Sequence, residues 1–175
     1  MSKIHFIITG GTIDSVWSGA KDTAVVSKHS IIPEYFEKLQ RNLKFNDEFE
    51  FTEVCMKDSR EITDEDRANI IEAIKKTNSN RIIITHGTYT MPITARYLKE
   101  HISIDDKTII LTGSMVPIEG FDYSDAPFNL GYAYAEVLKR EPGIYVCMNA
   151  TTFDPEEVEK DTSEGKFYSV FQQEQ

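Results

Sequence analysis

The chain is poor in the features on which several common kinds of protein depend. It contains two cysteines, Cys55 and Cys147, and both lie within apolar runs, where a thiol more often packs as a small hydrophobe than reacts. No apolar stretch approaches the roughly 20 residues that span a bilayer. The sequence therefore predicts neither a disulfide framework nor a membrane protein.

Motifs for charged or metallic partners are also missing. The formal net charge is −10, and clustered Lys and Arg for phosphate backbones or anionic lipid are lacking, so we expect no nucleic-acid or membrane partner. Neither G-x-G-x-x-G nor a phosphate loop ending in G-K-[ST] occurs, and the four histidines lack metal-ligand spacing. We expect no cofactor and no metal, and we expect His86 to pack or to orient its turn.

What is present suits one folded domain. A length of 175 residues with 40% hydrophobic and 27% charged residues predicts a single globular domain over residues 1–175. Met1–Lys3 leads directly into an apolar run, without the longer apolar segment and cleavage site of a signal peptide. We therefore expect a cytoplasmic protein.

Apolar runs and helix-start signals alternate along most of the chain. The expected strands are Ile4–Ile8, Glu50–Met56, Arg81–Thr85, Thr108–Leu111 and Ile144–Met148. The expected helices run from about Pro33 to Asn42, Thr63 to Thr77, Pro92 to Glu100 and Asp125 to Lys139. This alternation predicts an α/β fold with a doubly wound, mainly parallel sheet and flanking helices.

Two segments fall outside this alternation. Thr12–Lys28 is polar and lacks a helical or strand period around the single Trp17, which predicts a long loop that acts as a lid. Residues 150–175 form an acidic, weakly periodic tail with one further short strand near Lys166–Phe171.

Three turns that contain glycine follow expected strands. They are Thr9-Gly10-Gly11-Thr12, Thr85-His86-Gly87-Thr88 and Thr112-Gly113-Ser114. Because the carboxyl ends of parallel strands share one sheet edge, we expect the hydroxyls of Thr12, Thr88 and Ser114 to line one crevice. One alternative is that the glycines only permit tight turns while Thr and Ser cap helices. Three such turns at one edge favour a threonine enzyme, or a binding site that imitates one.

These motifs resemble those of one enzyme family. The family is that of the bacterial-type L-asparaginases, which are threonine amidohydrolases. Its motif T-G-G-T-I resembles Ile8–Ile13, its motif H-G-T-D-T-M resembles Thr85–Met91, and its motif L-T-G-[AS]-M resembles Leu111–Met115. Asp58–Thr63, Ser124–Leu130 and Asn149–Lys160 extend the resemblance in the same order, so it covers nearly the whole chain. The resemblance implies the fold of the asparaginase N-terminal domain.

The resemblance also implies roles for particular residues. Thr12 would attack a side-chain amide, ammonia would leave, and water would release the acid from an acyl-threonine intermediate. Thr88 and Lys160 match the second threonine and the lysine that activate the nucleophile or water, and burial can bring a lysine pKa towards neutrality. We expect substrate binding by the following set: Gly11, Ser59, Arg60, Glu61, Gly87 and Ser114.

The chain departs from the family in three respects. Tyr89 stands where the family has an aspartate that holds the substrate ammonium, and a phenol supplies no negative charge at pH 7. Glu61 and Asp58 are candidates to replace that charge. A lid tyrosine is not evident, and the Tyr89 hydroxyl is a candidate to replace it in catalysis. The resemblance extends only to the N-terminal domain, so we expect the smaller C-terminal domain to be absent.

The sequence leaves three functions open. The first is hydrolysis of L-asparagine or a related small amide by a homodimer or homotetramer, since the family works as dimers of dimers. The second is a non-catalytic small-molecule-binding or interaction domain derived from the same fold. The third keeps hydrolysis but acts on an amide without a free α-ammonium.

Overall fold

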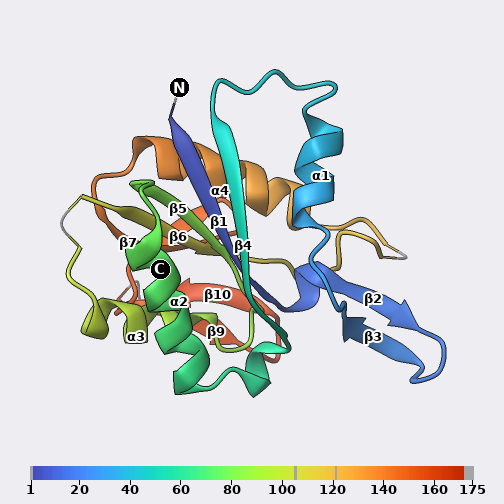
Figure 1. Ribbon diagram of the computed structural model, residues 1–175. Coiled ribbons are helices and arrows are strands. Elements are labelled where there is room, and N and C mark those ends of the chain that lie inside the picture. The colour runs from blue at the N-terminus through green and yellow to red at the C-terminus, as the bar shows by residue number, and fades with distance from the viewer. Residues whose placement is uncertain (1, 105, 121, 172–175) are drawn as a thin grey trace.

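The computed structural model describes residues 2–104, 106–120 and 122–171 (Figure 1). The strands are β1 (Lys3–Gly10), β2 (Ser15–Ser18), β3 (Thr23–Val26), β4 (Glu48–Lys57), β5 (Arg81–Thr85), β6 (Thr108–Thr112), β7 (Gly143–Met148), β8 (Thr151–Phe153), β9 (Val158–Asp161) and β10 (Lys166–Ser169). The helices are α1 (Ile32–Leu39), α2 (Asp64–Lys76), α3 (Met91–His101) and α4 (Ala126–Lys139). Short 3₁₀ turns span Thr12–Asp14 and Ser59–Glu61.

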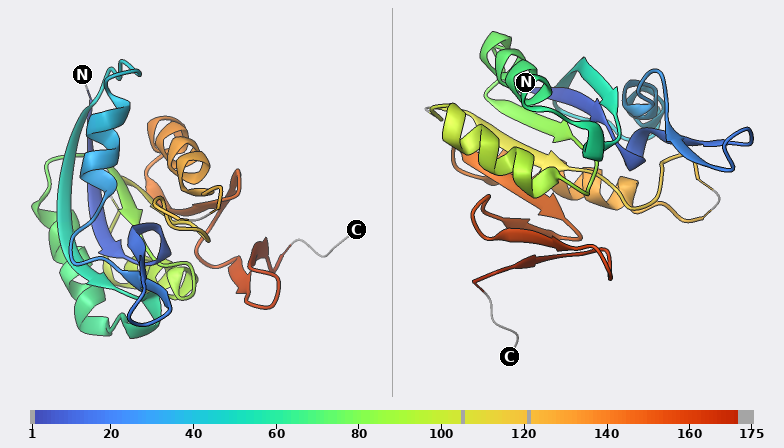
Figure 2. Two further views of the ribbon diagram at one scale, coloured as in Figure 1. Left: turned by 90° about the vertical axis from the view of Figure 1, so that its right-hand side faces the viewer. Right: turned by 90° about the horizontal axis from the view of Figure 1, so that it is seen from below.

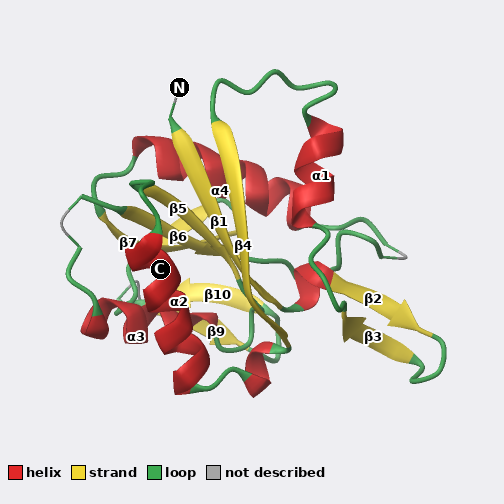
Figure 3. Cartoon of the chain, in the orientation of Figure 1, coloured by secondary structure: helices red, strands yellow, loops and turns green. Residues whose placement is uncertain are grey.

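A mainly parallel sheet forms the centre of the molecule (Figure 3). Within the described residues its strand order is β4-β1-β5-β6-β7-β8, and β8 alone is antiparallel to its neighbour β7. The central strands β1, β5 and β6 are almost continuous apolar runs, as expected for strands that are buried on both faces. The mainly parallel sheet predicted from the sequence is confirmed.

Helices cover both faces of this sheet (Figure 2). On one face, Ile7 of β1 packs with residues of α2 and α3, including Ile70 and Leu98. On the other face, Phe6 of β1 packs with residues of α1 and α4, including Phe36. Since successive strand residues point to opposite faces, one apolar strand supplies both cores. The doubly wound arrangement is therefore confirmed.

The helix starts follow local signals. The hydroxyl of Thr63 accepts a hydrogen bond from the Asp66 amide at 3.3 Å, and the Asp66 carboxylate accepts one from the Thr63 amide at 2.8 Å. This reciprocal capping box satisfies two amides that have no partner inside α2. Proline occupies the first turn of the other three helices, where its missing N–H costs nothing.

The segment Thr12–Lys28 is not the single long loop that its composition predicts. After the 3₁₀ turn, β2 and β3 pair as an antiparallel hairpin that projects from the body of the molecule (Figure 1). Four of its eight strand residues are exposed, and these do not alternate with the more buried ones, so the sequence lacks the period-two pattern by which strands are found.

The acidic tail also contains more strand than its sequence predicts. The short strand expected near Lys166–Phe171 is β10, but its partner β9 and the strand β8 were not expected. Arg96 of α3 holds the start of β9: its Nη1 donates to the carbonyl oxygen of Val158 at 3.0 Å, and its Nη2 lies 3.1 Å from a carboxylate oxygen of Glu159. Because polar and charged contacts hold β9 in place, no hydrophobic pattern marks this strand in the sequence.

Both cysteines behave as packing residues. Burial raises the pKa of the Cys147 thiol to about 12 and that of the Cys55 thiol to about 11, so both stay protonated at neutral pH. In the part of the chain that the structure describes, no helix has the length and apolar character needed to cross a bilayer.

Candidate active site

Two of the glycine turns meet at the carboxyl edge of the sheet. A Cβ atom on Gly11 would lie 2.4 Å from both the Cα and the N of Gly87, so the two backbones are in direct contact. Gly11 also has a φ of +85°, which residues with a side chain rarely adopt. A Cβ on Gly87 would in turn lie 2.8 Å from Oγ of Ser59. Neither glycine leaves room for another residue, and this contact brings the turn with Thr12 beside the turn with Thr88.

A cavity of about 140 Å³ opens where these turns meet. Its walls come from the ends of β1, β4 and β5 and from β9, and the lining residues are Gly11, Thr12, Asp58, Ser59, Arg60, Gly87, Thr88, Tyr89 and Lys160. The cavity thus brings together all four expected catalytic residues and four of the six expected substrate-binding residues. Its carboxyl-edge position is where open α/β sheets bind their ligands.

The side chains of Thr88 and Lys160 form a hydrogen bond. The Nζ of Lys160 donates to Oγ1 of Thr88 at 2.7 Å, although the two residues are 72 positions apart. Lys160 is half-buried on β9, and burial holds the pKa of its ammonium below the usual value because it disfavours the charged form. The hydroxyl of Thr12 has no hydrogen-bond partner among the described residues, and it is partly exposed to the cavity.

Asp58 is the one carboxylate among the residues that line the cavity, and it is already paired. Arg60 donates to it twice, from Nε at 3.0 Å and from Nη2 at 2.7 Å. These bonds hold the pKa of Asp58 below its usual range, so the carboxylate stays ionised and neutralised by its partner. No unpaired negative charge lines the cavity.

Tyr89 lies close to two basic side chains. The centre of its ring is 5.9 Å from the guanidinium carbon of Arg60 and 5.9 Å from Nζ of Lys160. Both distances are within the range of a cation–π interaction. The side chain, which is 53% exposed, therefore presents an aromatic face where the related motif has a carboxylate.

A buried chain of hydrogen bonds holds the Thr88 turn from behind. Nε of Arg67 donates to the Thr94 hydroxyl at 3.2 Å, and that hydroxyl lies 3.0 Å from Nε2 of His86. His86 Nδ1 is 2.8 Å from the carbonyl oxygen of Gly87, which can only accept, so Nδ1 carries the proton and Nε2 accepts from Thr94. Burial lowers the pKa of His86 to about 4, so the ring is neutral. His86 orients its turn, as the sequence analysis expected.

Two expected site residues lie outside the cavity lining. Ser114 is fully buried, and its hydroxyl donates to the carbonyl oxygen of Val116 at 2.6 Å. Glu61 is exposed at the end of the 3₁₀ turn. The structure therefore brings Thr12 and Thr88 together but turns the third expected hydroxyl into the protein. In contrast, Arg67 and Thr94 belong to helices and support the site without any signal in the sequence.

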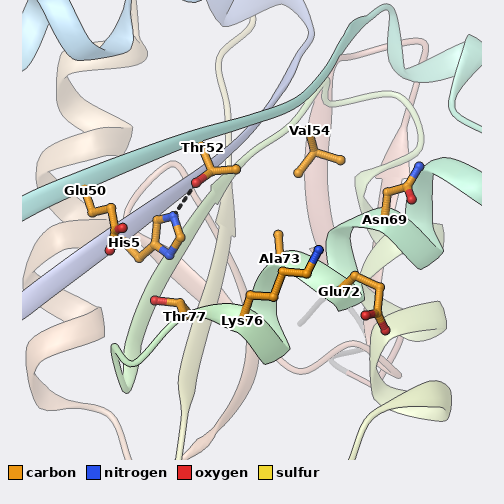
Figure 4. Close-up of a pocket in the computed structure, with 9 residues that line it drawn as sticks. All are labelled: His5, Glu50, Thr52, Val54, Asn69, Glu72, Ala73, Lys76 and Thr77. Atoms are coloured by element: carbon orange, nitrogen blue, oxygen red, sulfur yellow. Dashed lines mark hydrogen bonds between the residues drawn. The ribbon is translucent and has the colours of Figure 1, made fainter.

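A larger hollow outside this site has a different character (Figure 4). It has a volume of about 370 Å³ and lies between β4 and α2, where Nε2 of His5 is 2.8 Å from the Thr52 hydroxyl. It shares no lining residue with the cavity at the turns. Across the described residues, no group of three or more His, Cys, Asp or Glu side chains could hold a metal ion.

Fold and site together define a doubly wound α/β domain with a threonine–lysine cluster at the carboxyl edge of its sheet. The chain belongs to the asparaginase family, because the family model for the N-terminal asparaginase domain matches residues 3–173.

Individual relatives agree with this membership. The chain is 34% identical over 147 residues to an L-asparaginase of Thermococcus kodakarensis, a match that covers 83% of this chain and 43% of the relative. It is 28% identical over 166 residues to a glutaminase-asparaginase of Acinetobacter glutaminasificans, covering 91% of this chain and 50% of the relative.

Solved structures give the same result for the fold. The thermostable L-asparaginase from Thermococcus kodakarensis superposes with a TM-score of 0.81 at 30% identity, over 96% of this chain and 51% of that one. A probable cytoplasmic L-asparaginase from Campylobacter jejuni gives a TM-score of 0.80 at 26% identity, over 98% and 54%. The chain spans about half the length of the relatives it matches.

Proposed function

We propose that this protein is an amidohydrolase that converts L-asparagine or a related small amide to the acid and ammonia, with Thr12 as the nucleophile. The observation that carries the proposal is the presence of Thr12, Thr88 and Lys160 in the lining of one small cavity. Membership of the asparaginase family supports this reaction class.

In the first half of the proposed reaction, the Thr12 hydroxyl attacks the carboxamide carbon and loses its proton through Thr88 to a neutral Lys160. The last step of that path is short, because Nζ of Lys160 lies 2.7 Å from Oγ1 of Thr88, and a neutral Nζ accepts the hydroxyl proton at this distance. The amide of Gly11 already donates to the Lys57 carbonyl oxygen at 2.9 Å, so we assign stabilisation of the oxyanion to the neighbouring amides of Thr12 and Thr88.

The second half returns the enzyme to its starting state. The carbon–nitrogen bond breaks, the proton held by Lys160 passes to the leaving nitrogen, and ammonia departs from an ester on Thr12. Water then attacks the ester carbonyl, with its proton taken by the same lysine. As the ester bond breaks, Lys160 returns this proton through Thr88 to the Thr12 oxygen, so the acid product leaves and both the Thr12 hydroxyl and the neutral lysine are restored.

We assign the substrate carboxylate to Arg60 and Ser59. Arg60 uses Nε and Nη2 for Asp58, which leaves its Nη1 nitrogen without a partner among the described residues. A guanidinium suits a carboxylate because its N–H groups match the spacing of the two oxygens.

The test is ammonia release from L-asparagine by the purified protein. Thr12→Ala should lower turnover by on the order of 10³-fold or more, while Thr151→Ala, at an exposed position on β8, should leave it unchanged. Rapid-quench mass spectrometry should find an acyl adduct on the peptide that contains Thr12. Equal turnover in wild type and Thr12→Ala would exclude Thr12 as the nucleophile.

The pairing of Asp58 favours a second candidate substrate, an amide with a carboxylate but no α-ammonium. Since no carboxylate in the lining is free, and Tyr89 contacts the basic side chains of Arg60 and Lys160, the cavity offers no negative charge to an ammonium group. Succinic acid monoamide and L-asparagine differ only in that group. A higher kcat/KM for the monoamide would favour this candidate, and a preference for asparagine would exclude it.

A non-catalytic binding domain is the remaining candidate, and the unbonded Thr12 hydroxyl favours it. Isothermal titration calorimetry with L-aspartate and L-asparagine would detect binding, and mass spectrometry of the same samples would detect product. Binding without product would favour a sensor or interaction domain, whereas sustained product formation would exclude it.

We also propose that the described residues form one α/β domain, that its copies associate as a homodimer or homotetramer, and that it works in the cytoplasm. The name of the Campylobacter jejuni structure supports the last of these. Sedimentation velocity at several protein concentrations tests the association, and a concentration-independent monomer would exclude it.

A further inference from the structure

Asp14 lies two residues after Thr12, within the same 3₁₀ turn. Its side chain is 1% exposed, and its Oδ1 accepts hydrogen bonds from the Ser30 hydroxyl at 2.7 Å and from the Ile31 amide at 2.9 Å. Ile31 is the residue immediately before α1. The carboxyl group therefore ties the turn that carries Thr12 to the beginning of a core helix.

The backbone of Asp14 makes two further connections. Its amide donates to the Gly11 carbonyl oxygen at 3.1 Å, and its carbonyl oxygen accepts from the Ser27 amide at 2.9 Å. Ser27 directly follows β3, and β2 begins at Ser15, so both ends of the hairpin are fixed at this one residue. Movement of the hairpin and position of the Thr12 turn are thus coupled through Asp14.

The second carboxyl oxygen of Asp14 is unusual. Oδ2 is buried and has no hydrogen-bond partner among the described residues. Burial raises the pKa of Asp14 to about 6, and its bonds to Ser30 and Ile31 only partly oppose this effect. An asparagine could accept the same two hydrogen bonds without a charge, so a simple structural link does not require an ionisable group here.

Several charged groups surround this carboxyl group. A hollow of about 220 Å³ beside it is also lined by His29, Glu34 and Glu119. Glu53 of β4 raises the Asp14 pKa further by its charge, and it is itself 3.2 Å from Nδ1 of His29. Glu34 of α1 is paired with Lys38 at 2.6 Å. Among these groups, Glu53 disfavours ionisation of Asp14 in the same direction as burial.

We propose that Asp14 is a positioning residue for Thr12, whose carboxyl group clamps the nucleophile turn and the β2–β3 hairpin to the start of α1 and loosens when it ionises. The effect on catalysis rests on the proposed function, but the clamp does not. Ionisation leaves a charge on the unsatisfied Oδ2, and opening the hairpin lets water reach it. By linkage, the equilibrium shifts towards the open hairpin by up to about 100-fold between pH 4 and pH 8.

The single tryptophan provides a direct test of the clamp. Trp17 lies on β2 and is 49% exposed, so its fluorescence reports the surroundings of the hairpin. In wild type the emission should change with a midpoint near pH 6. Asp14→Asn should abolish that transition, whereas His29→Gln should keep it. No transition in wild type, the same transition in Asp14→Asn, or its loss in His29→Gln would each overturn the proposal.

A kinetic test separates positioning from overall stability. Asp14→Ala should lower kcat for ammonia release by about tenfold or more and change KM by no more than about twofold, because the substrate-binding residues are untouched. Asp14→Asn should keep kcat within about threefold of wild type and should lack the loss above pH 6 that opening of the hairpin causes, so that kcat rises more steeply with pH than in wild type. Unchanged kcat in Asp14→Ala would overturn positioning. If wild type releases no ammonia, the proposed function fails, while the fluorescence transition still decides whether the clamp exists.

Discussion

At the scale of single residues, Lys160 determines the pH dependence that we expect. A lysine accepts a proton only in its neutral form, and burial lowers the pKa of this one. The value of kcat/KM should therefore rise with pH until Lys160 is deprotonated. Lys160→Arg keeps a donor for Thr88 but cannot lose its proton at these pH values, so activity should fall by on the order of 10²-fold or more and the rising limb should disappear.

The control for this variant is Lys166→Arg, an exposed position on the adjacent strand β10. It should reproduce the wild-type pH profile, measured as initial rates of ammonia release from pH 5 to pH 10. A Lys160→Arg enzyme with an unchanged rising limb would assign that limb to another group.

Gly11 and Gly19 form a second matched pair. A Cβ on Gly11 would meet the Gly87 backbone at 2.4 Å, whereas one on Gly19 at the hairpin tip would meet nothing within 4 Å. Gly11→Ala should destabilise the protein by about 3 kcal/mol or more and abolish activity, through both the clash and the positive φ. Gly19→Ala should keep its activity, and its free energy of unfolding, measured in urea, should stay within about 0.5 kcal/mol of the wild-type value. Equal stability of the two variants would contradict the backbone contact.

Site residues could be predicted from the sequence where they directly follow a strand. Thr12 and Thr88 each come directly after a glycine turn, and Lys160 was found through its place in the family motif. Ser114 was misplaced because a turn sequence does not reveal in which direction its side chain points: Ser114 bonds to its own loop at Val116. The support from Arg67 and Thr94 could not be predicted, since the two residues lie on different helices and meet only in the folded protein.

At the scale of elements, the N-terminus of α2 gives a further prediction. Thr63→Ala removes the capping hydroxyl, which accepts from the Asp66 amide and donates to its carboxylate. The free energy of unfolding should fall by about 1 kcal/mol. Urea denaturation followed by circular dichroism measures this change, with Thr151→Ala at an exposed position on β8 as the control. A loss equal to that of the control would show that the cap contributes little.

Helices and strands could be predicted from the sequence where one face, or both faces, of the element are buried. The apolar runs of β1, β5 and β6 identify themselves, and proline or a capping box marks the start of each helix. The hairpin β2–β3 and the strand β9 were missed because backbone pairing and charge contacts hold them, and these leave no periodic pattern.

At the scale of the whole molecule, two buried groups give opposite pH dependences of stability. The His86 pKa is about 4 in the folded protein and 6.5 when unfolded. The neutral ring therefore contributes fully to the free energy of unfolding above pH 6.5, and this contribution is lost as pH falls towards 4. The Asp14 pKa is raised from 3.8 to about 6, so the folded state binds the extra proton and stability falls as pH rises through this window. The two slopes largely cancel between pH 4 and pH 6.

Removal of one group should reveal the other. In Asp14→Asn only the pH dependence that His86 causes remains. The free energy of unfolding should therefore decrease by up to about 3 kcal/mol between pH 6.5 and pH 4, more steeply than in wild type. Urea unfolding at four pH values in this range measures both proteins. Parallel pH curves for the two proteins would mean that Asp14 titrates alike in the folded and unfolded states.

The division of the threonine–lysine cluster between two sheets has a practical consequence. Thr12 and Thr88 follow strands of the main sheet, whereas Lys160 belongs to the separate pair β9–β10, which Arg96 fastens to α3. A peptide bond cut between β8 and β9 would separate Lys160, the proposed base, from Thr12, the proposed nucleophile, without breaking any ladder of the main sheet. Under the proposed function, the protein is therefore a candidate split reporter, in which reassociation of the two fragments would restore ammonia release.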